Sequence, residues 1–305
     1  MTRIDVHQHA WTPRLVAALA AREAPPRLRV GADGGWVLEL AGEAPYALAD
    51  VPPLAPDDAD VAVLALSSAL GVERLPGDEA RELIAAWDAD ADAFAAADDG
   101  ASAPTPARLA WGALPLADAT PADVDAALAR GRVGLSLPAT ELGSPAALDR
   151  LGPLLERLAQ HDAPLLVHPG PVAAGTWLPP LTAYVAQLQA AWLAWVLHGR
   201  AQHPSLRVVF AALAGLAPLH AERLHARVRE AAGAALDDER TFFDTSSYGP
   251  VAVDALLRVV GEDRLVLGSD RPYAAASALG SPLGARIAEA NPAALLRLRP
   301  AAVAA

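Results

Sequence analysis

The sequence predicts an α/β fold, a single (β/α)8 barrel in which eight parallel strands alternate with helices. The first observation is that short apolar runs alternate with Ala- and Leu-rich stretches of helical periodicity along the whole chain. The second is that eight such runs are present, the number that closes a barrel of this type. The third is the length of 305 residues, which suits one undivided domain spanning 1–305.

The predicted strands are short runs of apolar and β-branched residues, each closed by a turn or a helical pattern. In chain order they are Arg3–His7, Val61–Leu66, Leu109–Leu114, Val133–Leu137, Leu165–His168, Leu206–Ala211, Thr241–Asp244 and Leu265–Gly268. Because long connections separate successive strands, we expect the strands to lie parallel.

The stretches between the strands carry apolar residues at helical spacing. They predict the helices Asp78–Phe94, Pro121–Arg130, Ala146–Gln160, Leu181–Leu197, Pro218–Ala232 and Val251–Val260. The period is clearest in the apolar stripe Leu181, Tyr184, Val185, Leu188, Trp192 and Trp195. We expect this stripe to face the barrel; the alternative is that its aromatic residues cover the interface of a homodimer.

A longer segment, 12–58, separates the first two strands and is expected to form a small cap. Within it, Leu28–Val30 and Trp36–Leu40 flank the turn-rich Gly31–Gly35, a pattern typical of a β-hairpin. The segment follows the carboxyl end of the first strand. It should therefore lie over the face on which barrel enzymes carry their active sites.

Composition limits the partners and the location of the protein. The chain is 53% hydrophobic and 20% charged, which supports a large core. Its net charge of −12, without a basic cluster, argues against nucleic acid and anionic membranes and leaves a small-molecule substrate as the expected partner. No apolar run has the length of a membrane span, and Met1-Thr2-Arg3 begins no signal peptide. We therefore expect a cytoplasmic protein.

Two residue types are missing from the chain, Cys and Lys, and all 24 basic residues are Arg. Without Cys there are no disulfides, thiolate nucleophiles or Cys-based metal sites. Without Lys there is no Schiff base, no phosphate-binding lysine of the Walker type and no lysine carbamate bridging two metals. The chemistry must rest on His, Asp, Glu and hydroxyl side chains, with a bound metal.

Three histidines and one aspartate fall at the carboxyl ends of predicted strands. His7 and His9 are two residues apart, so their side chains project to the same side of the first strand. His168 ends the fifth strand and Asp270 follows the eighth. Barrel enzymes place catalytic groups at these ends. The pattern predicts one divalent metal ion on these four residues; the donors suit Zn²⁺ and also admit Mn²⁺, Fe²⁺ or Co²⁺.

Several motifs, in order along nearly the whole chain, resemble the amidohydrolase superfamily, specifically the amidohydrolase-related branch that contains aminocarboxymuconate-semialdehyde decarboxylase. These motifs are Ile4–His9, Val167–Pro169, Phe243–Ser247, Leu267–Pro272 and Asn291-Pro292. The resemblance implies a distorted barrel of the metal-dependent hydrolase type with one divalent ion, usually zinc. By residue-for-residue match, it gives as ligands His7, His9, His168 and Asp270.

One position departs from the pattern of this branch. Its members usually carry a further His at the end of the sixth strand, as a general base or to hold the catalytic water, and the matching residue here is Ala212. A bound metal lowers the pKa of its water without a separate base. We therefore expect Asp270 to be the catalytic acid–base group.

Loops at the metal end contain side chains suited to binding a substrate. The candidates are Trp11, Trp177, Ser246, Tyr248 and Arg271, with Ser247 and Tyr273 nearby. Aromatic rings beside an Arg suit a planar or cyclic substrate that bears a carboxylate. The alternatives are that the tryptophans pack under the cap and that Arg271 forms an ion pair with a nearby acid such as Asp244.

Three functions fit these residues. The leading hypothesis is hydrolysis of a lactone, ester or amide by metal-activated water, with Asp270 carrying the proton. The first alternative is non-oxidative decarboxylation of an aromatic or unsaturated acid, a carbon–carbon lyase reaction in which Arg271 anchors the carboxylate. The second alternative is a non-catalytic, metal-stabilised binding protein, which the Ala212 substitution motivates.

Overall fold

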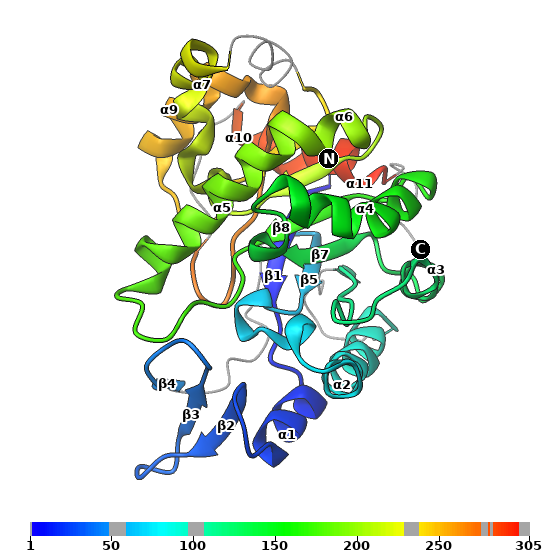
Figure 1. Cartoon of the computed structure of the whole chain (residues 1–305), viewed down its shortest axis with the longest axis vertical. Coiled ribbons are helices and arrows are strands. Elements are labelled where there is room, and N and C mark those ends of the chain that lie inside the picture. Colours follow the sequence, from blue (N-terminus) through cyan, green and yellow to red (C-terminus); the bar gives the residue numbers. More distant parts are fainter. Residues whose placement is uncertain are drawn as a thin grey trace.

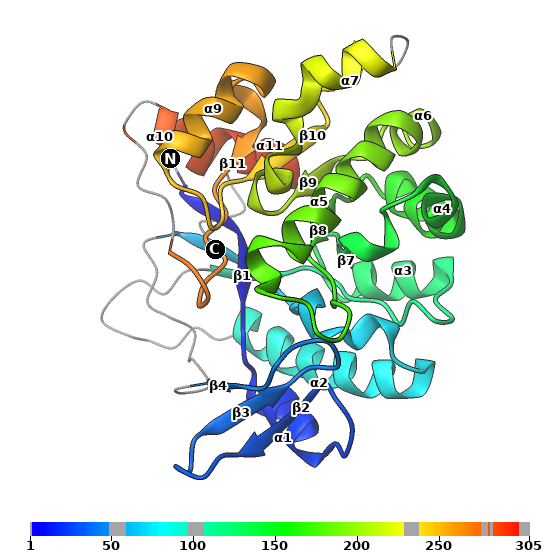
Figure 2. The ribbon, with the colours of Figure 1, turned by 60° about the vertical axis from the view of Figure 1, so that its left-hand side comes forward.

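Parallel strands run through the centre of the molecule, and helices surround them (Figures 1 and 2). The computed structural model describes residues 2–48, 59–96, 107–228, 238–275, 280 and 283–298. The central strands are β1 (Ile4–His9), β5 (Val61–Ala65), β6 (Ala107–Ala110), β7 (Leu135–Pro138), β8 (Leu165–His168), β9 (Val208–Phe210), β10 (Thr241–Asp244) and β11 (Leu265–Val266).

Two parallel sheets, joined at both ends by backbone hydrogen bonds, make up the ring. The first has the order β1-β5-β6 and the second the order β11-β10-β9-β8-β7. At one junction the N–H of Gly112 donates to the carbonyl of Gly134 at 2.8 Å, and at the other the N–H of Val6 donates to the carbonyl of Leu267 at 2.9 Å. The prediction of a (β/α)8 barrel is confirmed.

The strand ends differ from the predicted ones by a few residues. β8 and β10 match, whereas β1 continues to His9 and β6 ends at Ala110 rather than Leu114. Beyond Ala110 the chain changes its neighbour, because the N–H of Trp111 bonds to β5 and that of Gly112 bonds to the segment before β7. The ladder is therefore irregular there, although the chain stays in the barrel wall.

The outer layer consists of helices of unequal length. They are α1 (Pro13–Ala21), α2 (Gly77–Ala96), α3 (Pro121–Ala129), α4 (Pro145–Gln160), α5 (Ala183–Ala194), α6 (Arg200–Gln202), α7 (Ala221–Arg227), α9 (Pro250–Val260), α10 (Leu283–Ala285) and α11 (Asn291–Leu296). α1, α3, α4 and α9 begin with Pro directly after the N-cap, where the missing N–H costs no hydrogen bond. No helix in the described part of the chain is long and apolar enough to cross a membrane.

The predicted helix Leu181–Leu197 begins two residues later than expected, runs on past its predicted end and is more exposed at its start. A 3-10 turn, Pro179–Leu181, precedes α5, and a wider π turn, Trp195–Gly199, follows it. Trp192 and Trp195 are buried in the core as predicted, but Leu181 is 70% exposed. The first turns of α5 cover the mouth of the barrel instead of its side.

The segment after β9 confirms only part of the helix predicted over Pro218–Ala232. A 3-10 segment, Ala212–His220, comes first, and only α7 is α-helical; residues 229–232 lie outside the described part. Ala212 through Leu216 all have positive φ, between 46° and 64°. Such a left-handed turn costs L-residues roughly 1–2 kcal/mol each. Burial of the apolar side chains in this turn offsets part of that cost.

The insertion after β1 folds into a helix and a small antiparallel sheet. The predicted hairpin is confirmed as β2 (Arg27–Val30) paired with β3 (Trp36–Glu39), and a third strand, β4 (Tyr46–Leu48), extends it. The sheet packs with α1 and α2 in a second core cluster around Leu38 and Trp87. Residues 49–58 of the predicted cap lie outside the described residues.

Candidate metal centre and cavity

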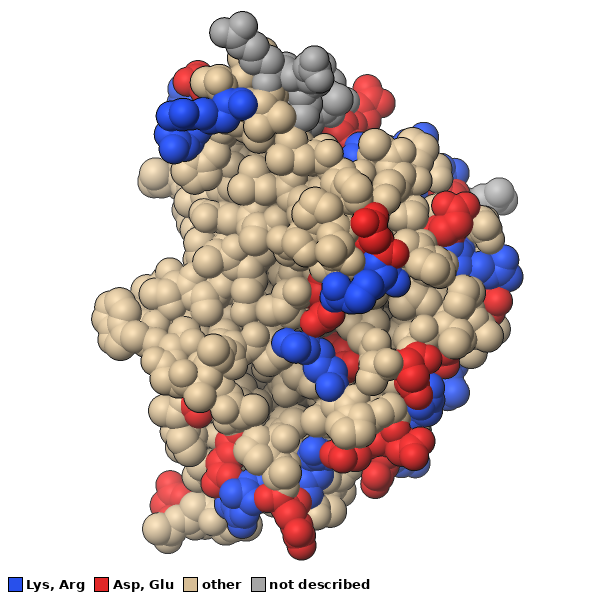
Figure 3. Space-filling model, in the orientation of Figure 1, with Lys and Arg blue, Asp and Glu red and all other residues tan. Residues whose placement is uncertain are grey.

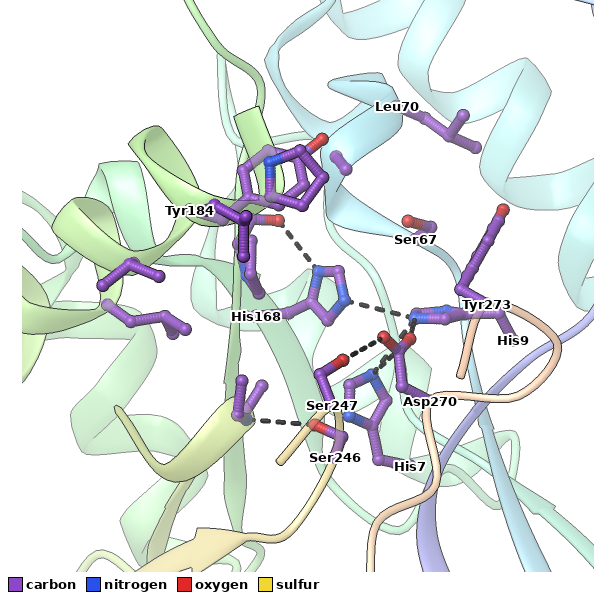
Figure 4. Close-up of a pocket in the computed structure, with 18 of the residues that line it drawn as sticks. His7, His9, Ser67, Leu70, His168, Tyr184, Ser246, Ser247, Asp270 and Tyr273 are labelled. Carbon is purple, nitrogen blue, oxygen red and sulfur yellow. Dashed lines mark hydrogen bonds and ion pairs between the residues drawn. The ribbon is translucent and has the colours of Figure 1, made fainter. Parts of the chain in front are cut away.

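Three imidazoles and one carboxylate converge at the carboxyl end of the barrel (Figure 4). His7 and His9 come from β1, His168 ends β8, and Asp270 follows β11. The Nε2 atom of His9 lies 3.1 Å from Nε2 of His7 and 3.2 Å from Nε2 of His168. Oδ1 of Asp270 lies 3.2 Å from Nε2 of His9 and 3.9 Å from Nε2 of His7. All four candidate ligand atoms lie within 4.8 Å of one another.

The three separations from His9 Nε2, of 3.1–3.2 Å, are those of atoms that share one ion, whereas the 3.9 Å between His7 and Asp270 is somewhat longer. Two ligands about 2.1 Å from a metal, at angles of 90° to 120°, lie about 3.0–3.6 Å apart. The three histidines are buried, and the side chain of Asp270 is 20% exposed toward the cavity. The four residues that the sequence predicts as ligands therefore form a set that fits a single divalent ion.

The other nitrogen of each imidazole has an acceptor that sets its tautomer. Nδ1 of His7 lies 2.7 Å from Asp244 Oδ2, Nδ1 of His9 lies 2.9 Å from the carbonyl of Ala65, and Nδ1 of His168 lies 2.8 Å from the carbonyl of Pro169. A proton on each Nδ1 leaves the lone pair of each Nε2 facing the common centre. When all three imidazoles are neutral, their lone pairs repel one another at this distance, and a cation between them relieves the repulsion.

Asp244 orients the site, although the sequence analysis named it only as an ion-pair partner for Arg271. Its carboxylate is fully buried, and it accepts hydrogen bonds from the backbone N–H groups of Ser246 and Ala212, each at 2.9 Å. Within the described ranges, the ion pair that Asp244 forms is with His7 and not with Arg271. The signal was available, because Asp244 ends a predicted strand as His168 does.

The charges around the site shift the pKa values of two histidines in opposite directions. Burial opposes a charge on His7, but Asp244 and then Asp270 outweigh it and raise its pKa to about 9. Burial, together with the neighbouring His9 and His7, holds the pKa of His168 well below its usual value. Without metal, His7 therefore holds the proton of the cluster at neutral pH.

We predict that metal binding at pH 7.5 releases about one proton per ion, because His7 must lose its proton to coordinate. The affinity of the protein for the metal should rise about tenfold per pH unit until the pH reaches the pKa of His7, at about 9. Above that pH the affinity should no longer change. Calorimetry in buffers of different ionisation enthalpy measures the proton count. In the Asp244→Asn variant, fewer protons should be released per bound ion, because burial then keeps His7 neutral before the metal binds. A wild-type binding heat that is independent of the buffer would contradict this prediction.

Asp270 is held in a backbone conformation that few L-residues adopt. Its φ is +58°, and its N–H donates to the carbonyl of His7 at 2.9 Å. The hydroxyl of Ser247 lies 3.4 Å from Oδ2, the oxygen that does not face the histidines most closely. Such strain persists where the surrounding contacts impose it, and it is often found at active sites. One carboxylate oxygen of Asp270 thus faces the ligand cluster while the other remains near a hydroxyl group.

A cavity of about 520 Å³ opens from the metal ligands toward the cap and α5. Ser246 and Tyr248, two of the predicted substrate-binding residues, line it. Trp11 does not: it is buried in the core cluster under the cap. Trp177 is 78% exposed outside the cavity, and Arg271 continues the pairing with β1 through its backbone, where its carbonyl accepts the N–H of His9. The predictions of substrate contact for these three find no support in the geometry.

Three residues that line the cavity were not predicted from the sequence. Glu43 and Tyr46 come from the cap, and Tyr184 comes from α5. Tyr184 belongs to the apolar stripe that was assigned to the barrel core. The helical period places Tyr184 on the apolar face of α5, but it does not tell whether that face packs against the core or lies over the mouth of the barrel.

Ala212 lies in the cavity wall where the resemblance implies a histidine. Its backbone N–H donates to Asp244 Oδ1 at 2.9 Å and lies 3.1 Å from Ser246 Oγ. His220 and His225, which follow Ala212 in the chain, are exposed and do not line the cavity. Among the described residues that line the cavity, Asp270 is therefore the carboxylate that lies beside the histidine cluster.

Comparison with known proteins agrees with this geometry. The model of the family described as "Amidohydrolase" matches residues 4–298. Among solved structures, IDCase of Metarhizium anisopliae in its apo form has a TM-score of 0.75 at 19% identity, with 97% of each chain covered.

Two further structures are decarboxylases by their descriptions. The 5-carboxyvanillate decarboxylase of Novosphingobium aromaticivorans, complexed with manganese and 4-hydroxy-3-methoxy-5-nitrobenzoic acid, gives a TM-score of 0.67 at 17% identity over 97% of this chain and 96% of that one. The 2,6-dihydroxybenzoate decarboxylase of Rhizobium also gives 0.67, at 14% identity over 97% and 99%. No curated protein matches the sequence. By the family match over nearly its whole length, this chain belongs to the amidohydrolase family.

Proposed function

We propose that this protein catalyses the metal-dependent, non-oxidative decarboxylation of an aromatic or unsaturated acid. The observation that carries the proposal is that Asp270 reaches both the histidine cluster and the cavity, where a substrate would lie. When bound, a divalent ion supplies a Lewis acid that orients the acid substrate and polarises its oxygens. His7, His9, His168 and Asp270 would hold this ion.

The protein supplies the proton that decarboxylation requires. Protonated Asp270 gives its proton to the substrate carbon that carries the carboxylate. The bond from that carbon to the carboxylate then breaks, its electron pair returns to the substrate, and carbon dioxide leaves. Asp270 regains a proton from solvent, so that one carboxylate and one proton become one C–H product and one carbon dioxide.

The walls of the cavity favour the same reaction. Leu70, Val185, Leu188, Ala211 and Ala212 supply apolar surface beside the ligands. A carboxylate loses its charge when it becomes carbon dioxide, so an apolar wall favours the product over the charged group. Ala212 contributes to this surface where a histidine would make it polar.

The decarboxylases among the similar structures support this choice over hydrolysis, the function that the sequence analysis placed first. The manganese in one of them supports Mn²⁺ as a candidate beside Zn²⁺. Hydrolysis of a lactone, ester or amide remains the second candidate. The observation that favours it is the complete ligand set, which suits activation of a water molecule equally well.

The test is product analysis with protein reconstituted in turn with Zn²⁺ and Mn²⁺. We expect carbon dioxide release from at least one member of a panel of hydroxybenzoates and unsaturated acids. Turnover of lactones or amides with no release of carbon dioxide would favour hydrolysis instead. Tight binding of acids without any turnover would support the non-catalytic binding protein that the Ala212 substitution suggests.

A further inference from the structure

Glu43 places a carboxylate in the wall of the cavity on the cap side. The residue lies between β3 and β4, and its side chain is partly buried. Oε1 accepts a hydrogen bond from the hydroxyl of Tyr184 at 2.5 Å, which links the cap to α5. Oε2 has no hydrogen bond to any residue in the described ranges, so it can accept one from a bound molecule.

The backbone around Glu43 is fixed by a close contact. A Cβ added to the neighbouring Gly42 would lie 1.7 Å from the carbonyl oxygen of Val172, in the segment between β8 and α5. Only glycine fits there, so the loop of the cap lies directly against the rim of the barrel. The position of the Glu43 carboxylate is therefore set by two contacts, one of its backbone and one of its side chain.

Glu43 has no cation near it in the cavity. Among the described residues that line the cavity there is no Arg, and Glu43 and Asp270 are its acidic residues. The wall contributed by the β8–α5 segment and α5 cannot supply a charge, because residues 169–197 contain no Asp, Glu, Lys or Arg. The protruding part of this segment is accordingly uncharged in Figure 3.

Tyr46, Tyr184 and Tyr273, which line the cavity, remain neutral hydrogen-bond donors. Burial, and then the charge of Glu43, raise the pKa of Tyr46 to about 12. Burial, together with the hydrogen bond to Glu43, raises the pKa of Tyr184 as well, and burial raises that of Tyr273. The cap side of the cavity therefore carries one negative charge and several hydroxyl groups.

We propose that Glu43 determines substrate specificity by selecting an acid with a single carboxylate and a hydrogen-bond donor, a hydroxyl or amino group, at its other end. This inference rests on the proposed function, in which the metal end of the cavity takes the carboxylate. A second carboxylate would face Glu43 without a cation to balance it and would be rejected. A hydroxyl or amino group would donate to the open Oε2.

The expected size of the selection follows from the charge. A hydrogen bond to a charged group is worth more than a neutral one, and an uncompensated pair of like charges is unfavourable. Because of these two effects, the Kd of a dicarboxylate should exceed that of a hydroxy acid of the same shape by at least about tenfold.

The experiment measures Kd by calorimetry for metal-loaded protein with benzoate, 3- and 4-hydroxybenzoate, isophthalate and terephthalate. Wild type should bind a hydroxybenzoate at least about tenfold more tightly than the matching dicarboxylate. In Glu43→Gln this ratio should fall by about tenfold, because the charge is lost while the shape is kept. Tyr184→Phe retains the charge and should still discriminate against dicarboxylates.

Glu23→Gln is the matched control, since it removes an exposed acid of the same insertion that does not line the cavity. The ratio of the dicarboxylate Kd to the hydroxybenzoate Kd in this variant should equal the wild-type ratio. A ratio in Glu43→Gln that equals the wild-type value would overturn the inference and leave the proposed function intact. Failure of the wild type to bind every acid in the panel would overturn both.

Discussion

Asp270→Asn should lower kcat for decarboxylation by about 10² to 10⁴-fold, the range expected for loss of one general acid–base group. The amide cannot donate a proton to the substrate carbon. It keeps the size of the carboxylate and one coordinating oxygen, so part of the metal affinity should remain. Rates measured at saturating metal, with the metal content of the same samples, separate the two effects.

Ser247→Ala provides the comparison for this substitution. Ser247 Oγ lies 3.4 Å from Asp270 Oδ2, at the long end of hydrogen-bond distances. Its removal should leave the proton on Asp270 and change kcat by less than about tenfold. Activity that survives in fully metal-loaded Asp270→Asn would show that another group carries the proton.

His168→Ala should abolish metal binding at stoichiometric concentrations and, with it, both turnover and metal-dependent stabilisation. At a free metal concentration 100 times its Kd, binding to the folded state stabilises a protein by about 2.7 kcal/mol. The wild type should therefore show a higher Tm when Zn²⁺ or Mn²⁺ is added, and the variant should not.

His198→Ala is the matched control for loss of a histidine. Its imidazole pairs with Asp149 at 2.8 Å, away from the cavity. This variant should bind one ion per chain and keep the wild-type rise in Tm. A metal-dependent rise of equal size in His168→Ala would remove His168 from the ligand set.

The barrel and the metal cluster could be predicted from the sequence because both depend on local patterns. Apolar runs and helical periods identify the strands and helices. The rule that barrel enzymes work at the carboxyl ends of strands then places His7, His9, His168 and Asp270 together, although they are far apart in the chain. The same rule would have found Asp244.

The rest of the cavity depends on tertiary contacts that no local pattern encodes. Glu43 reaches the cavity only because Gly42 lets the cap lie against the rim of the barrel. Ala212 begins a left-handed turn whose φ values are rare for alanine and leucine, so no residue propensity predicts this turn. Trp177 could be recognised as an aromatic residue in a loop, but its position outside the cavity could not.

The sequence predicts the residues of the site better than it predicts the reaction that the site catalyses. The same ligands on the same fold can serve hydrolysis or decarboxylation, because the function of a barrel depends on its loops and its substrate. The absence of Arg from the described cavity lining removes the carboxylate anchor that the sequence analysis assigned to Arg271. In the proposed function the metal end of the cavity takes over this role.

The most direct test of the metal centre is anomalous diffraction from crystals grown with Zn²⁺ or Mn²⁺. We expect one peak per chain at about 2.0–2.3 Å from Nε2 of His7, His9 and His168 and from a carboxylate oxygen of Asp270. A chain with no peak between these four side chains, or with an ion bound elsewhere, would contradict the account.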